Sequence, residues 1–341
     1  MSSPYTLIKN APLDRRNTFR VPVRAALLTE VREPAVLAEL LAKPEVNGRP
    51  VLVLGEGSNL LFTRDFNGLV LAMMNRGIEI LEDNGESVCV RAQAGEDWHG
   101  LVRWSLAQGL CGLENLSLIP GTVGAAPIQN IGAYGAELSE TLEVVEVFDR
   151  QANTPVRLSR EQCGFSYRQS VFKQQPERWI ITAVELRLRR NATLKLDYKG
   201  VPEELASMNV TQPTAKDVSE AVCRLRRRKL PDPAKIGNAG SFFKNPIVSN
   251  GQADELKADH PDLPIFAAPD GKKLSAAWLI ERCGWKGFRD GDAGVSDKHA
   301  LVLVNHGRAS GAQIWSLAER IRNSVQGRFG IRLDPEPRLI F

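Results

Sequence analysis

The sequence lacks the residues and spacings on which several protein classes depend. Only 5 of its 341 residues are cysteine, the number is odd, and no CxxC motif occurs. A disulfide framework is therefore not expected, and the thiols fit a reducing compartment. The 4 histidines show no HExxH spacing, so we expect no bound metal.

Long apolar runs and a strong charge of one sign are also missing. The longest unbroken apolar run covers residues 69–74, whereas a membrane-spanning helix needs about 20 residues. No secretory signal is visible near the N-terminus, so we expect a cytoplasmic protein without membrane insertion. The formal net charge of +4 neither requires nor excludes an anionic partner. We expect a monomer that does not bind nucleic acid.

The composition that remains is that of a folded protein with more than one domain. Hydrophobic residues make up 43% and charged residues 25% of the chain, which is ordinary globular usage. Strand and helix patterns alternate without a strict βαβ rhythm, which favours an α+β fold over a doubly wound parallel sheet. Strands are expected near residues 51–54, 69–73, 87–92, 143–148 and 179–188, and helices near 97–109, 214–229, 275–283 and 314–325.

A polar segment at 189–214 is the best candidate for a linker, because it contains two prolines and few apolar residues. The helix that follows ends in a basic run at 224–229. Cations at a helix C-terminus gain about 0.3–1 kcal/mol each from the helix dipole, so a solvated helix end explains the run. A diphosphate clamp and a nucleic-acid patch are the alternatives.

The first glycine motif, Gly55-Glu56-Gly57-Ser58-Asn59, directly follows a predicted strand. Glycines let a backbone turn sharply and direct successive N–H groups at an anion, as a phosphate cradle does. Leu60 occupies the third glycine position of a dinucleotide-binding GxGxxG motif, so this is not that fingerprint. An ordinary turn after a strand is the simpler interpretation of this motif alone.

A second segment, residues 120–135, combines four glycines and three alanines with almost no charge. A backbone with so few side chains can lie flat against a planar ligand. The alternative is a flexible linker, but Ile128, Ile131 and Tyr134 make the segment more apolar than most linkers. We therefore predict a ligand-binding loop.

Two further motifs lie in the C-terminal third. Residues 237–246 place Ser241 among small residues, with Lys244 and Asn245 just after it, and could present a hydroxyl group to a ligand. Residues 334–338 hold Glu336 between two prolines. Each segment alone is equally compatible with an ordinary turn or a polar tail.

In this order along the chain, the motifs resemble the UDP-N-acetylenolpyruvoylglucosamine reductase family, also called UDP-N-acetylmuramate dehydrogenases, which make a peptidoglycan precursor. The resemblance runs from Asn17-Thr18-Phe19 to Glu336 and includes the strings at 167–173 and 229–233. Tyr198 resembles the mobile-loop tyrosine of the type I subgroup.

The resemblance implies an α+β fold with a vanillyl-alcohol-oxidase, PCMH-type FAD-binding region of two subdomains and a C-terminal α+β substrate-binding domain. We expect the first at 17–190, divided near residue 75, and the second at 214–341. It further implies noncovalent FAD, NADPH as hydride donor and a UDP-sugar enolpyruvyl ether as substrate. The enzyme would be an oxidoreductase acting on CH–OH donors in the reverse sense, with UDP-N-acetylmuramate as product.

The resemblance also implies residue roles. Ser241 would be the proton donor, and Arg168 and Glu336 would stabilise the enolic intermediate. The residues expected at the substrate are Tyr198, Arg226, Lys229, Lys244 and Asn245. The residues expected at the cofactor are Gly55, Glu56, Gly57, Ser58, Asn59, Pro120, Gly121, Thr122, Val123, Gly124, Ala125, Gln129, Asn130, Gly132, Ala133 and Tyr134.

Two other functions remain open at this point. A flavin oxidase of the same broad FAD-binding class would use oxygen instead of the enolpyruvyl ether. A non-enzymatic nucleotide- or nucleic-acid-binding protein would depend on the basic run at 224–229. Which basic residues contact the diphosphate of the substrate, and which the nicotinamide cofactor, is also open.

Overall fold

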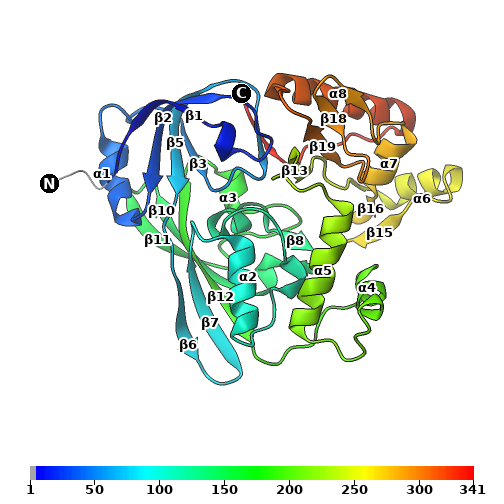
Figure 1. Ribbon diagram of the computed structural model, residues 1–341, viewed down its shortest axis with the longest axis horizontal. Helices are drawn as coiled ribbons and strands as arrows, with labels where there is room; N and C mark the ends of the chain where they lie inside the picture. The colour runs from blue at the N-terminus through cyan, green and yellow to red at the C-terminus, as the bar shows by residue number, and fades with distance from the viewer. Residues whose placement is uncertain (1–4) are drawn as a thin grey trace. The chain divides into compact units, whose positions relative to one another are not determined.

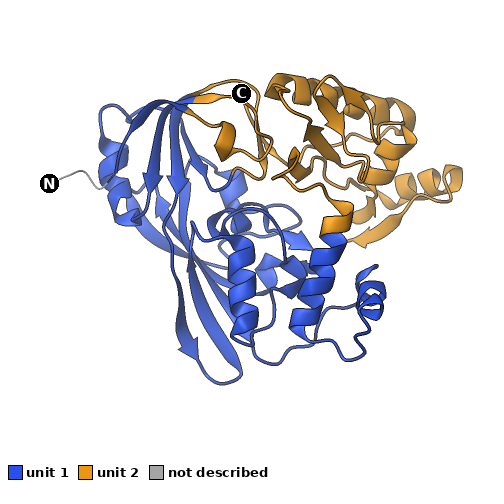
Figure 2. Ribbon diagram, in the orientation of Figure 1, with its two compact units in different colours: residues 1–11, 25–56, 67–226 blue, residues 12–24, 57–66, 227–341 orange. Residues whose placement is uncertain are grey.

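The computed structural model describes residues 5–341, which divide into two compact units interleaved along the chain (Figure 2). The first unit takes its described residues from 1–11, 25–56 and 67–226, and the second is formed by 12–24, 57–66 and 227–341. These units are defined by packing. The predicted domain boundaries at 190 and 214, and the predicted division near 75, stay predictions.

The first unit contains two sheets (Figure 1). One has the strand order β1-β2-β5-β3, in which β3 and β5 run parallel. The other has the order β11-β10-β12-β7-β6 and is antiparallel throughout. The strands are β1 (Ile8–Pro12), β2 (Arg24–Val31), β3 (Val51–Leu54), β5 (Phe66–Met73), β6 (Ile78–Asp83), β7 (Ser87–Gln93), β10 (Leu142–Asp149), β11 (Thr154–Ser159) and β12 (Trp179–Arg189), with a hairpin of β8 (Gly132–Ala133) and β9 (Ala136–Glu137).

Helices of the first unit are short, apart from two. They are α1 (Leu37–Ala42), α2 (Trp98–Ala107), α3 (Val171–Gln174), α4 (Val201–Ser207) and α5 (Ala215–Lys229), with 3-10 turns η2 (Pro34–Val36), η3 (Glu114–Leu116), η4 (Val123–Gln129) and η5 (Leu138–Glu140). Helix α2 begins as its sequence predicts, because the Asp97 carboxylate accepts the Gly100 N–H at 2.5 Å. It ends before Gly109, whose φ of 72° suits glycine.

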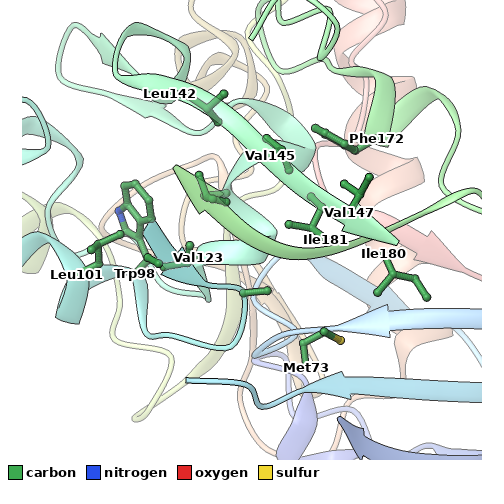
Figure 3. Packing of buried hydrophobic residues seen from close by; sticks show 14 of the residues in the cluster. Met73, Trp98, Leu101, Val123, Leu142, Val145, Val147, Phe172, Ile180 and Ile181 are labelled. Atoms are coloured by element: carbon green, nitrogen blue, oxygen red, sulfur yellow. The ribbon is translucent and has the colours of Figure 1, made fainter. Parts of the chain in front are cut away.

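The core of the first unit includes residues of both sheets and of α1, and part of it lies between α2, η4 and the antiparallel sheet (Figure 3). Trp98 is 1% exposed, and its indole N–H donates to the Leu116 carbonyl at 2.9 Å. Val123 of η4 and Val145 of β10 are fully buried in the same cluster. This packing fixes η4, the turn that carries much of the predicted ligand-binding loop, against a rigid sheet.

The predicted linker at 189–214 is partly wrong, because helix α4 lies inside it. Val201 and Leu205, four residues apart, are buried against Val218 and Val222 of α5 in a small separate cluster. Helix α5 itself has the predicted cap, in which the Thr214 hydroxyl accepts the Asp217 N–H at 3.4 Å and the Asp217 carboxylate accepts the Thr214 N–H at 2.9 Å. The polar composition of the segment gave no indication of the two apolar residues, Val201 and Leu205, whose packing orders it.

The second unit has two small sheets and a parallel pair of strands. The sheet orders are β13-β19-β18-β17 and β14-β16-β15, and β20 pairs with β4. The elements are η1 (Asp14–Arg16), β4 (Leu60–Phe62), β13 (Gly237–Ser241), β14 (Ile247–Val248), α6 (Asn250–Asp259), β15 (Ile265–Ala268), β16 (Gly271–Leu274), α7 (Ala276–Arg282), β17 (Arg289–Asp290), β18 (Ala293–Val295), β19 (Val302–Asn305), α8 (Gly311–Phe329) and β20 (Arg338–Ile340).

The mixture of antiparallel sheets, one parallel pair and scattered helices confirms the predicted α+β class. Among residues 5–341, no helix is both long and apolar enough to cross a membrane.

Candidate functional site

The first two glycine motifs meet inside the first unit. A Cβ built on Gly55 would overlap the Thr122 hydroxyl oxygen and would lie 3.2 Å from Cγ2 of the same side chain. Glu56 is tied to the same place: burial and the charge of Asp97 raise the pKa of its carboxyl group, and a hydrogen bond from the Gly121 N–H opposes that rise. Only glycine at position 55 allows the two segments to approach this closely.

Residues 121–124 are held by the chain that precedes α2. The Val123 N–H donates to the Glu96 carbonyl and the Gly124 N–H to the Ala94 carbonyl, each at 2.9 Å. A Cβ on Gly124 would lie 2.6 Å from that of Ala94. These two N–H groups are therefore occupied, and a phosphate held by backbone donors would have to find them elsewhere, as at the 55–59 turn.

The rest of the loop is ordered rather than flexible. Asn130 ends η4 in the left-handed region with φ of 44°, is fully buried, and donates to Glu137 Oε2 at 2.8 Å. Gly124, Ala125, Gly132 and Ala133 are half-buried, so small residues form part of the loop's outer surface, next to the exposed Ile128. Such a surface suits a planar ligand.

Arg168 lies against this loop. Its guanidinium donates to the Gly132 carbonyl at 2.8 Å, and its own carbonyl accepts a hydrogen bond from the Lys173 ammonium at 3.2 Å. The backbone of Arg168 has a φ of 55°, an uncommon conformation for a residue with a Cβ. Strained backbone of this kind gathers at functional sites, and here Asn130 and Tyr134 share it.

Arg226 reaches the same region from the last turns of α5. Its Nε donates to the Leu118 carbonyl at 3.0 Å. Burial lowers the pKa of this guanidinium; Tyr134 and Cys223 oppose that effect and the charge of Arg168 adds to it. Arg168 and Arg226 are within electrostatic range of each other, and two such guanidinium groups can hold an anion such as a carboxylate or phosphate.

Tyr198 lies near the same loop, at the exposed end of the 190–200 segment. Its ring packs edge to face on Tyr134, with ring centroids 5.2 Å apart, and it is 48% exposed. The structure therefore groups Tyr198, Tyr134, Arg168 and Arg226 in one unit, although they are widely separated in the sequence.

In the second unit, the Ser241 and Glu336 motifs are joined through their backbones. The Glu336 N–H donates to the Phe242 carbonyl at 2.8 Å, and the Lys244 N–H donates to the Asp334 carbonyl at 2.9 Å. Ser241 ends β13, where it pairs with Val302 across a bulge. The backbone of the Glu336 motif therefore lies beside that of the Ser241 motif, although the two are almost one hundred residues apart in the sequence.

Gly57, Ser58 and Asn59 belong to this second unit, so the first motif is divided between the units. The Asn59 carbonyl accepts the Arg338 N–H at 3.0 Å, and its amide donates to the Glu336 carbonyl at 3.5 Å. Three predicted motifs are thus neighbours in the second unit. Asn245 is partly committed to structure, because its Oδ1 accepts the Ala276 N–H at 3.0 Å and caps α7.

Two residues to which the sequence gave no role, Lys286 and His299, lie within electrostatic range of each other, and His299 also lies within range of the predicted Lys229. Burial lowers the pKa of His299, and the charges of Lys229 and Lys286 lower it further. Lys286 also borders an open cavity of about 420 Å³ with Asp297. An alignment could have drawn attention to Lys286 and His299, but one sequence contains no such signal. Within the described residues 5–341, no group of acidic, histidine or cysteine side chains could hold a metal ion.

Two parts of the chain match the models of known protein domains. Residues 25–158 match the model of an FAD binding domain, and residues 232–340 match that of the UDP-N-acetylenolpyruvoylglucosamine reductase C-terminal domain. The chain is 53% identical over 338 residues to the reductase of that name from Xylella fastidiosa, covering 98% of this chain and 96% of the relative. It is 53% identical over 334 residues to that of Pseudomonas aeruginosa, covering 98% of each.

Among solved structures, the UDP-N-acetylenolpyruvylglucosamine reductase from Thermus caldophilus aligns with a TM-score of 0.68 at 26% identity. The alignment covers 99% of each chain.

Proposed function

The chain belongs to the UDP-N-acetylenolpyruvoylglucosamine reductase family, and from that premise we propose that it reduces UDP-N-acetylenolpyruvoylglucosamine to UDP-N-acetylmuramate with NADPH. It is an FAD-dependent oxidoreductase, with a vanillyl-alcohol-oxidase, PCMH-type FAD-binding region and a C-terminal α+β domain. We propose three further points: the identity of the substrate, the use of NADPH as hydride donor and the roles of individual residues.

The residues of the first unit fit FAD. The contact of Gly55 with Thr122 leaves no room for a side chain between the two loops, and the half-buried small residues of the 124–133 segment offer a flat surface. The Val123 and Gly124 N–H groups are already hydrogen-bonded, so the diphosphate would need donors other than these two.

Bound FAD would supply the chemistry of hydride transfer between NADPH and the enolpyruvyl group. The protein has two tasks in the second half of the reaction. The terminal carbon of the enolpyruvyl group receives the hydride, and negative charge develops on the carboxylate, where Arg168 would stabilise it. The adjacent carbon then takes a proton, which Ser241 would donate, with Glu336 as its neighbour in stabilising the enolic species.

The groups added in this reaction correct one expectation, which concerns the enzyme class. A hydride and a proton are added across a carbon–carbon double bond, so the group oxidised in the reverse direction is CH–CH. The expected classification as an oxidoreductase acting on CH–OH donors is therefore wrong on chemical grounds.

The observation that carries the proposal is the hydrogen bond from the Glu336 N–H to the Phe242 carbonyl, which makes Glu336 a close neighbour of Ser241 in the fold. Neither a linker nor a simple nucleotide-binding module requires the Ser241 and Glu336 segments to be joined in this way. The second unit thereby supports a site for proton transfer beside the enolpyruvyl carbon.

An anaerobic absorption experiment tests the proposal. The pure protein should show flavin bands that fade on adding NADPH and return in full when the UDP-sugar enolpyruvyl ether is added without oxygen. Bands that return only with air would indicate an oxidase. A colourless protein that does not take up added FAD, but binds RNA at moderate salt, would contradict the proposal and favour the nucleic-acid alternative.

A further inference from the structure

Asn115, in the short turn η3, joins two segments whose aromatic side chains meet. Its side-chain Nδ2 donates to the Tyr134 carbonyl at 2.8 Å and to the Lys195 carbonyl at 3.0 Å. Tyr134 lies in the β8–β9 hairpin of the predicted cofactor loop, and Lys195 lies three residues before Tyr198. Asn115 is itself 2% exposed, so these hydrogen bonds are shielded from water.

The chemistry of the two partners specifies an amide at this position. Both are carbonyl oxygens, so only an NH₂ group, with two protons on one nitrogen, can satisfy both at once. An aspartate would direct oxygen atoms at both carbonyls, and an alanine would leave both without this donor. Asparagine is therefore required at position 115 if the two segments are to stay together.

The turn that carries Asn115 is rigid. The next residue, Leu116, accepts the indole N–H of Trp98 at 2.9 Å, and the preceding Glu114 accepts the Gly112 N–H at 2.6 Å. One residue further, the Ser117 and Ser219 hydroxyl groups are 2.7 Å apart, which ties the turn to α5. Asn115 thus holds both segments at fixed positions relative to the rigid core.

The 190–200 segment has other contacts with the same hairpin, but they are exposed. The Lys195 ammonium donates to the Gly135 carbonyl at 3.1 Å and pairs with Glu140. Exposed ion pairs contribute little to stability, because water screens them. Leu194 and Leu196 of the segment pack, as Tyr134 does, against the α4–α5 cluster, and the Asn115 amide adds the buried hydrogen bonds that join the segment to the hairpin.

We infer that Asn115 is a positioning residue: it fixes the Tyr198-bearing segment against the Tyr134 hairpin and thereby sets affinity for the UDP-sugar without touching it. The part of this inference that concerns the UDP-sugar rests on the proposed function. The structural part, that Asn115 orders residues 190–200, does not.

The structural part is tested by limited proteolysis of the folded holoenzyme. Lys195 and Lys199 are exposed trypsin sites in the segment. Asn115→Ala should raise the rate of cleavage at these two sites by about tenfold, and Asn115→Asp by more. The reason is that losing the free energy of about one hydrogen bond raises the population of molecules with the segment detached by about that factor. Unchanged cleavage at both sites in both variants would overturn the inference.

Asn75 provides the matched control. It is also 2% exposed, and its Nδ2 donates to the Thr182 carbonyl at 2.8 Å and to the Gln93 side chain at 2.7 Å. None of these partners belongs to the 190–200 segment. Asn75→Ala should lower the melting temperature without accelerating cleavage at the two lysines; equal acceleration would show that Asn115 acts only through general stability.

The functional part is tested on the two half-reactions. Asn115→Ala should weaken binding of the UDP-sugar by about tenfold while reduction of the flavin by NADPH keeps its rate. In a Tyr198→Ala background the same change should have almost no further effect on UDP-sugar binding. An equal effect in both backgrounds, or faster proteolysis with unaltered UDP-sugar affinity, would overturn the positioning role. A wild-type protein that does not react with the UDP-sugar would refute the proposed function and leave the proteolysis result standing.

Discussion

The contact between Gly55 and Thr122 offers the sharpest single perturbation in the molecule. In a Gly55→Ala variant the new Cβ would overlap the Thr122 hydroxyl oxygen and would lie 3.2 Å and 3.3 Å from Cγ2 and Cβ of that side chain. Thr122 is 7% exposed and lies in a segment held by hydrogen bonds, so it has little freedom to move away. One of the two loops must therefore shift.

The cost follows from two opposing effects. Inserting a methyl group into a packed site costs about 1–3 kcal/mol. Gly55 does not have the positive φ that strains other residues, so replacing it with alanine also gains about 0.4–1 kcal/mol by restricting the unfolded chain. We expect a net loss of roughly 1–2 kcal/mol in the free energy of unfolding.

A second substitution isolates the contact. In a Thr122→Ala background, the hydroxyl oxygen and Cγ2 are gone, and the new methyl group meets only the Cβ at 3.3 Å. Gly55→Ala should then be neutral or should stabilise the protein by up to about 1 kcal/mol. The coupling between the two positions should accordingly be about 1–3 kcal/mol and favourable to the double variant.

Urea denaturation of the four proteins gives the coupling, and titration with FAD gives its consequence for the cofactor. Gly55→Ala should raise the FAD dissociation constant by about 5- to 100-fold, and the double variant should recover most of that loss. Gly327→Ala is the control glycine, because a Cβ there has nothing within 4 Å and lies inside α8. It should stabilise the protein by up to about 1 kcal/mol.

The reasoning fails if Gly55→Ala destabilises the protein by the same amount in both backgrounds. That result would mean that Thr122 is not the obstacle. Normal FAD affinity in the single variant, despite its lower stability, would show that this junction does not shape the cofactor site.

Three other predictions concern catalysis, acid stability and thiol reactivity. Ser241→Ala should leave reduction by NADPH intact and slow reoxidation by the enolpyruvyl substrate by about 10²–10⁴-fold; stopped-flow traces with both steps equally slowed would exclude its role as proton donor. Glu146 has a pKa lowered first by its hydrogen bond with Arg91, so its ionised form stabilises the protein above about pH 4.5 and that stabilisation is lost as pH falls through the lower folded-state pKa. Glu146→Gln should therefore be less stable than the wild type at pH 7 by a margin that shrinks towards pH 3, and a constant margin in urea denaturation would contradict this. Burial raises the pKa of the Cys163 thiol to about 12, whereas Cys283 is only half-buried, so iodoacetamide at pH 8 should modify Cys283 in the native protein and Cys163 only after unfolding. Mass spectrometry showing native modification of Cys163 at the rate of Cys283 would be the contrary result.

The sequence by itself determined where helices begin and end, because the residues that specify a helix end lie close to it in the chain. The cap of α2 at Asp97, its end before Gly109 and the start of α5 at Thr214 all follow from residues within one or two turns of each boundary. The motifs along the chain resemble those of the reductase family and so predicted membership of that family, which the comparisons confirmed.

Features that depend on distant residues were decided only by the tertiary structure. Helix α4 was missed because it has only two buried apolar side chains, Val201 and Leu205, in a polar segment. These two side chains find a partner only when α4 packs on α5. The division of the first glycine motif at Gly57 was equally invisible, because chain distance does not reveal which unit a turn packs against.

The contacts of single residues show the same limit. Gly55 with Thr122, Glu336 with Phe242 and Asn115 with Lys195 each join segments from 67 to 94 residues apart in the chain. A sequence specifies the chemistry of each partner, such as a missing side chain or an amide with two protons. Which partner that chemistry meets is fixed only when the cores close around both segments, because burial is what makes a gap or an unpaired carbonyl costly.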